Sequence, residues 1–102
     1  AYDVANDLSL KNRRLFVDQH ADPRRGAPDG MKVDTEGRLW TTGAGGVSVH
    51  TADGNYLGVF ELDEHAANLT FGGPDFSALF MTAGTSVYAV DTAVRGVVPG
   101  SR

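Results

Sequence analysis

Two segments of the chain follow the same residue pattern at a spacing of roughly 40 positions, and this repeat constrains the fold more than any other feature. Residues 28–50 and residues 68–90 each read as strand, polar turn, strand, small-residue turn, strand. A period of about 40 residues built from short strands is typical of a β-propeller, in which each repeat forms one four-stranded blade. The sequence therefore predicts an all-β fold of about two antiparallel blades, which are too few to close a ring.

The predicted strands follow from alternation of apolar and polar residues between turn signals. Met31-Lys32-Val33-Asp34 has the period of a strand with one buried face, and Gly37 can close a tight turn after it. Asp53-Gly54 is a good hairpin signal further along the chain. We expect strands at residues 2–4, 14–18, 31–34, 38–42, 47–50 and 56–62, a connecting loop at 19–27, and a second round of strands from 68 to 91.

Composition limits the classes of function that need to be considered. The chain has 102 residues, of which 41% are hydrophobic, and a formal net charge of −4. It can therefore bury a core and is not expected to bind nucleic acid. The basic pairs Arg13-Arg14 and Arg24-Arg25 are interpreted as solvated loop charges. The absence of cysteine excludes disulfides and thiolate zinc sites.

The sequence predicts neither a signal peptide nor a membrane-spanning segment. The first residues, Ala1 to Val4, show no basic start and no apolar run, so no signal peptide is expected here, and a cytoplasmic location is favoured over export. No apolar stretch reaches the roughly 20 residues that span a bilayer, so no membrane partner is expected.

Asp29 is the main candidate for chemistry. It stands just before the first strand of its repeat, and the innermost strands of a propeller all begin at the same rim of the central channel. Groups at that rim converge from different blades, so residues far apart in sequence can bind one ion. Oxygen ligands of this kind suit calcium, magnesium or manganese and can also hold zinc. The alternative interpretation is a structural turn, because Asp-Gly is common in turns.

The rim of the second repeat holds two further candidates. Asn68 could contact substrate there, or it could be a turn residue that bonds backbone. His65 precedes it and could act as a base near neutral pH; otherwise it is a solvated loop histidine. Trp40 and Phe80 occupy equivalent second-strand positions, and we expect both to pack between blades rather than stack on a ligand. Four aspartates are interpreted as ordinary turn residues: Asp34, Asp53, Asp75 and Asp91.

The residue motifs of the repeat resemble those of one family. Pro28-Asp29-Gly30-Met31, followed by Val33-Asp34, Glu36-Gly37 and Leu39-Trp40, is similar to the fifth blade of the SMP-30, gluconolactonase and luciferin-regenerating-enzyme family. Residues 68–75 resemble its sixth blade, and residues 94–100 resemble its C-terminus. Members are six-bladed propellers of about three times this length, so the chain looks like their C-terminal third. The implied divisions are the end of the preceding blade and a connecting segment (1–27), one blade (28–66), and the last blade with the tail (67–102).

This resemblance implies a function and also an incomplete site. It implies metal-dependent hydrolysis of a sugar-acid lactone, with Asp29 as a metal ligand and calcium as the expected ion. The family completes its site with a glutamate and an asparagine from blades that this sequence does not contain. The expected partners are therefore a small lactone and either the remaining N-terminal blades or further copies of the chain. The alternative function is that of a non-catalytic propeller fragment in assembly or binding.

Overall fold

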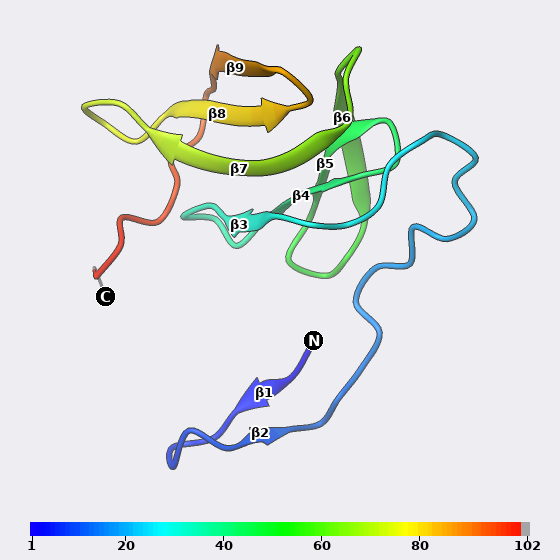
Figure 1. The fold of residues 1–102 in the computed structure, drawn as a ribbon. Coiled ribbons are helices and arrows are strands. Elements are labelled where there is room, and N and C mark those ends of the chain that lie inside the picture. Colours follow the sequence, from blue (N-terminus) through cyan, green and yellow to red (C-terminus); the bar gives the residue numbers. More distant parts are fainter. Residues whose placement is uncertain (101–102) are drawn as a thin grey trace.

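The structure, a computed structural model, describes residues 1–100. Within that range the chain is entirely β, with nine strands in three antiparallel sheets and no helix (Figure 1). None of residues 1–100 therefore belongs to a helix long and apolar enough to cross a membrane. The predicted all-β fold is confirmed.

The first large sheet is the four-stranded meander expected of a propeller blade. Its registers place Met31 opposite Thr41 and Trp40 opposite Val49. Gly45, with a φ of 83°, occupies the left-handed region in the turn that joins the second and third strands. The sheet has the order β3 (Met31–Val33), β4 (Leu39–Gly43), β5 (Gly46–His50) and β6 (Tyr56–Glu61).

The second large sheet has three strands rather than four. One step beyond the last strand pair, the amide of Thr92 still donates to the carbonyl of Ser77 at 2.9 Å, and the chain then leaves the sheet. The tail then returns to the first sheet, where Gly96 pairs with Asp34 in an isolated bridge. Residues after Asp91 therefore do not add a fourth strand. The sheet consists of β7 (Ala66–Gly72), β8 (Ala78–Ala83) and β9 (Ser86–Asp91).

The N-terminal residues form a separate two-stranded hairpin, β1 (Asp3–Val4) and β2 (Leu10–Lys11) (Figure 1). The strand predicted at 14–18 is wrong, since residues 12–30 contain no strand. Arg14 exchanges backbone hydrogen bonds with Ala1, at 2.9 and 2.6 Å. Within residues 1–100 this sheet contains only β1 and β2, and its pairing does not extend to residues 15–18.

The hydrophobic core lies between the two large sheets. The ring of Trp40 stacks on Phe60 with centroids 5.7 Å apart and meets the ring of Phe71 edge-on at 5.3 Å. The predicted packing role of Trp40 is confirmed, because its side chain is buried between the sheets. The buried core residues around it are Val47, Val49, Ala66, Leu69, Phe71, Leu79 and Met81.

Phe80 is not buried as Trp40 is, although it holds the equivalent position in the second sheet. It is 38% exposed, so the prediction that it packs between blades is wrong for this chain. In β8 the neighbouring residues Leu79 and Met81 point into the core, which directs Phe80 to the opposite face. That face is exposed, since Val87 of the neighbouring strand, on the same face, is 71% exposed.

Asp34 is also not the ordinary turn residue that the sequence suggested. Its side chain is 1% exposed, and its Oδ2 accepts a hydrogen bond from Trp40 Nε1 at 3.0 Å. Arg38 Nε lies 3.0 Å from the same oxygen. Oδ1 accepts the backbone amides of Glu36 and Arg38 at 2.9 and 3.0 Å. Asp34 thus ties its own turn to the indole ring at the centre of the core.

Candidate functional site

The candidate site is the end of the two large sheets at which β3 and β7 begin, which we call the Asp29 rim. Asp29 immediately precedes Gly30 and β3, and it is exposed. Its backbone amide donates to Thr42 Oγ1 at 3.0 Å, and the amide of Gly30 donates to the same oxygen at 3.0 Å. The backbone at Asp29 is therefore held by the end of β4, while its side chain stays accessible at the rim.

The structure brings Asn68 to the same rim. Strands β3 and β7 run side by side in the same direction (Figure 1), and the amide of Gly30 donates to the carbonyl of Ala67 at 3.1 Å. A Cβ added at Gly30 would lie 2.2 Å from Asn68 Oδ1, so only glycine fits there. Asn68 is exposed, and its Oδ1 accepts the amide of Leu69 at 2.9 Å. Asp29 and Asn68 are thus neighbours across the start of two strands.

His65 reaches the rim from the loop between β6 and β7. It lines a groove of about 770 Å³ together with Arg25, Ala27, Asp63 and Glu64. Asp29 and Asn68 do not line this groove. No side-chain hydrogen bond orients the imidazole within residues 1–100. Its carbonyl accepts the amide of Gly84 at 3.2 Å, which joins the loop to the β8–β9 turn.

Glu64 fastens the same loop to the second sheet. Its Oε2 accepts the hydroxyl of Tyr88 at 2.9 Å and its Oε1 accepts the amide of Thr85 at 3.0 Å. Hydrogen bonds from the Ser86 side chain, the Thr85 backbone and the Tyr88 hydroxyl lower the pKa of Glu64 to about 2. The Glu64 carboxylate therefore already accepts hydrogen bonds from the second sheet, and these bonds stabilise the loop that carries His65.

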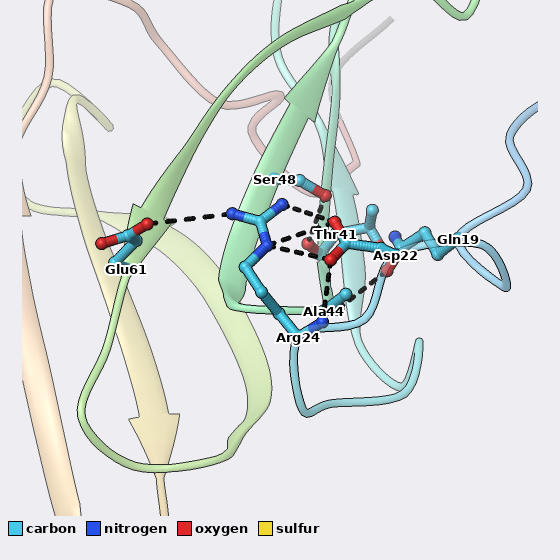
Figure 2. Close-up of polar contacts among 7 residues, drawn as sticks. All are labelled: Gln19, Asp22, Arg24, Thr41, Ala44, Ser48 and Glu61. Carbon is cyan, nitrogen blue, oxygen red and sulfur yellow. Dashed lines mark hydrogen bonds and ion pairs between the residues drawn. The ribbon is translucent and has the colours of Figure 1, made fainter.

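A polar cluster anchors the segment that leads into Asp29 (Figure 2). Gln19 Oε1 accepts the amide of Ala44 at 3.0 Å, in the β4–β5 turn. Arg24 pairs with Asp22 at 2.5 Å and reaches Glu61 at 3.8 Å. The Arg24 side chain, by hydrogen bonding, lowers the pKa of Asp22 to about 2. Arg24 is an exposed loop residue, as predicted, and its guanidinium also forms ion pairs with Asp22 and Glu61.

A complete metal centre does not form within the part of the chain that the structure describes. Residues 1–100 contain no group of three or more histidine, cysteine, aspartate or glutamate side chains that could hold a metal ion. Calcium normally takes six to eight oxygen ligands. Asp29 can contribute one carboxylate and Asn68 lies beside it, so these residues fit the edge of an oxygen-rich site but not a whole one.

Sequence reasoning missed Thr42 and Gln19. Thr42 ends the predicted second strand, and a threonine, Thr82, stands at the matching place of the second repeat. That recurrence was a visible signal, although it did not show what the hydroxyl binds. Gln19 gave no signal, because its partner Ala44 lies 25 residues away and is bound through a backbone amide.

Comparison with known proteins identifies the family. Residues 1–85 match the model of the SMP-30/gluconolactonase/LRE-like region. The chain belongs to this family. Over 85 residues it is 38% identical to a pentonolactonase of Haloferax volcanii, covering 80% of this chain and 28% of that protein. Over 90 residues it is 33% identical to a gluconolactonase of Zymomonas mobilis, covering 85% of this chain and 24% of that protein.

The family fold is also seen in solved structures. The chain superposes on the crystal structure of a suspected gluconolactonase with a TM-score of 0.84 and 31% identity. That alignment covers 95% of this chain and 32% of the other. The chain thus spans between about a quarter and a third of the length of the relatives that it matches. Its sheets are a propeller fragment, and the relatives are lactone hydrolases by name.

Proposed function

We propose that this chain supplies part of the active site of a metal-dependent hydrolase that opens the ring of a sugar-acid lactone. One observation carries the proposal: an exposed carboxylate, Asp29, stands at the rim where the inner strands of both sheets begin, with its backbone bound to Thr42. The lactonase names of the relatives support the substrate class.

Asp29 is the proposed metal ligand. Its carboxylate is a hard oxygen donor, which favours calcium, while magnesium, manganese and zinc also accept such donors. When bound, a divalent cation polarises the lactone carbonyl. Asp29 would also accept the proton of the water that adds to the carbonyl carbon, and that proton would pass to the ring oxygen as the bond between this oxygen and the acyl carbon breaks. Asn68, one strand away, would hold a substrate hydroxyl, and His65 would contact substrate from the groove side.

The remaining ligands would come from outside this chain, from N-terminal blades of the same fold. We therefore expect the isolated chain to bind calcium no better than an ordinary surface aspartate does. The completed ring for the test is a chimera in which this chain replaces the segment of the Haloferax volcanii pentonolactonase to which it is 38% identical.

Calcium titration by calorimetry and a lactone-opening assay on the completed ring test the proposal. Asp29→Asn should weaken calcium binding by roughly 100-fold or more, because losing even an outer-shell partner of a metal ligand costs about 10–100-fold. Asp53→Asn is the matched control, since Asp53 lies in the β5–β6 turn at the opposite end of the sheet. Equal calcium affinity in both variants would refute the role of Asp29.

A non-catalytic role in assembly is the second candidate, and the exposed apolar residues on the outer faces favour it. Met31 and Val33 on the first sheet are 56% and 46% exposed, and Val87 on the second is 71% exposed. Faces of this kind mark interaction surfaces. We expect the chain to bind N-terminal blades or copies of itself, which analytical ultracentrifugation would show. A monodisperse monomer with a cooperative melt would contradict this.

A further inference from the structure

Thr42 is placed differently from a threonine that merely fills a strand. Its side chain is 0% exposed, yet its hydroxyl accepts two hydrogen bonds from the backbone of Asp29 and Gly30, both at 3.0 Å. Its own amide donates to the carbonyl of Gly30 at 3.0 Å. Thr42 therefore holds the backbone of Asp29 and Gly30 through its side chain, and the following peptide, after Gly30, through its own amide.

The two bonds to the Thr42 hydroxyl are not part of the strand ladder. The last pair between β3 and β4 is Met31 with Thr41, so the amide of Asp29 has no ladder partner. Valine has nearly the same shape as threonine and would fill the same buried space, but it has no acceptor. A buried hydroxyl at this position is therefore explained by what it binds, which is the backbone of the rim residue.

The other side of the same peptide is closed by the second sheet. The amide of Gly30 also donates to Ala67, and any side chain at position 30 would collide with Asn68. The backbone at Asp29 is thus fixed between β4 and β7, and only side-chain rotation remains free. A metal-ligating side chain whose backbone is already fixed loses less conformational freedom when the ion binds.

We infer that Thr42 is a positioning residue for the Asp29 carboxylate. It does not touch the ion or the lactone; it holds the backbone so that the carboxylate is already directed to the rim when a cation arrives. This inference rests on the proposed function, because it assigns Thr42 to the same site. Thr42→Val is expected to remove the hydroxyl contacts at almost constant volume, and Thr42→Ser to keep them.

The first measurement is amide hydrogen exchange by NMR in the full 102-residue chain. In Thr42→Val the amide of Asp29 should exchange about fivefold to tenfold faster, which is the effect of losing one ordinary hydrogen bond. The amide of Gly30 should change less, because it also donates to the carbonyl of Ala67. Thr42→Ser should stay close to the wild type. Unchanged protection at Asp29 in Thr42→Val would overturn the inference.

The second measurement is calcium titration into the completed ring. Thr42→Val should weaken calcium binding by about fivefold to tenfold, and Thr42→Ser should restore it. Thr41→Val is the matched control: Thr41 is also buried, but its hydroxyl contacts only the carbonyls of Gly30 and Thr42, at 3.4 and 3.1 Å. A loss of stability without a loss of affinity would leave Thr42 as a purely structural residue.

The outcomes separate this inference from the proposed function. If Asp29→Asn abolishes calcium binding while Thr42→Val binds as tightly as the wild type, the proposed function stands and the positioning role is refuted. If Asp29→Asn leaves calcium binding unchanged, both are refuted. If Thr42→Val folds too poorly to titrate, Thr42→Ala together with Thr42→Ser decides the question, since only serine should recover affinity.

Discussion

Replacing Asp34 by alanine should destabilise the fold by about 3 kcal/mol, at the lower end of the 3–5 kcal/mol expected when one partner of a buried ion pair is removed. The side chain accepts Trp40 Nε1 and pairs with Arg38, both at 3.0 Å. Alanine leaves the buried indole N–H without an acceptor, at a cost of about 1–3 kcal/mol. The Arg38 side chain is 24% exposed, so water can solvate its charge when Asp34 is absent. The loss of this ion pair therefore costs less than it would for a fully buried arginine.

Urea unfolding measures this effect directly, because Trp40 is the only tryptophan and its fluorescence reports on the core. A loss of about 3 kcal/mol should lower the urea midpoint by roughly 1–3 M. Protein concentration must be held constant, since association shifts apparent stability. Asp53→Ala, at an exposed turn, is the control and should change stability by less than about 0.5 kcal/mol.

A double-mutant cycle tests the contact itself. Trp40→Phe keeps most of the ring but removes the N–H, and circular dichroism replaces fluorescence as the probe. Combined with Asp34→Ala, it should show a coupling of about 0.5–3 kcal/mol. An Asp34→Ala midpoint equal to that of Asp53→Ala would refute the buried position of the Asp34 carboxylate.

Three further outcomes are expected. Trp40→Ala should cost about 3–5 kcal/mol by the same denaturation assay, and an unchanged midpoint would contradict its burial. Gly30→Ala should cost about 1–3 kcal/mol in a thermal or urea melt, because the new Cβ would lie 2.2 Å from Asn68 Oδ1. The pKa of Glu64 in the folded chain, about 2, lies below its ordinary value of 4.5. Its hydrogen bonds therefore stabilise the fold above pH 4.5 and are lost as pH falls towards 2, and Glu64→Gln should flatten that part of a pH–stability curve.

Local pattern was enough to predict most strands. Alternation and turn residues placed the four strands of the first sheet within a few positions, since a half-buried strand must alternate. The segment 14–18 has the composition of a strand but is not one, because a strand also needs a neighbour to bond. Pattern alone cannot supply that neighbour.

At the Asp29 rim, too, the sequence predicted some features and only the packing of the strands decided others. The repeat placed Asp29 and Asn68 at equivalent points, and a shared rim followed from propeller geometry. The contact between Gly30 and Ala67 and the hold of Thr42 on the Asp29 backbone join residues that are distant in sequence. Such contacts depend on how two strands pack, which a single sequence does not display.

The sequence by itself therefore determined the fold class, the family and the main site candidate, because these rest on local periodicity and on motifs that are contiguous in the chain. The tertiary structure decided which residues are buried. Trp40 and Phe80 occupy matching positions, but only Trp40 has a second sheet against it. Asp34 looks like the other turn aspartates, but only Asp34 accepts a hydrogen bond from the indole N–H of Trp40. Burial is a property of the neighbours that a side chain meets, and those neighbours come from elsewhere in the chain.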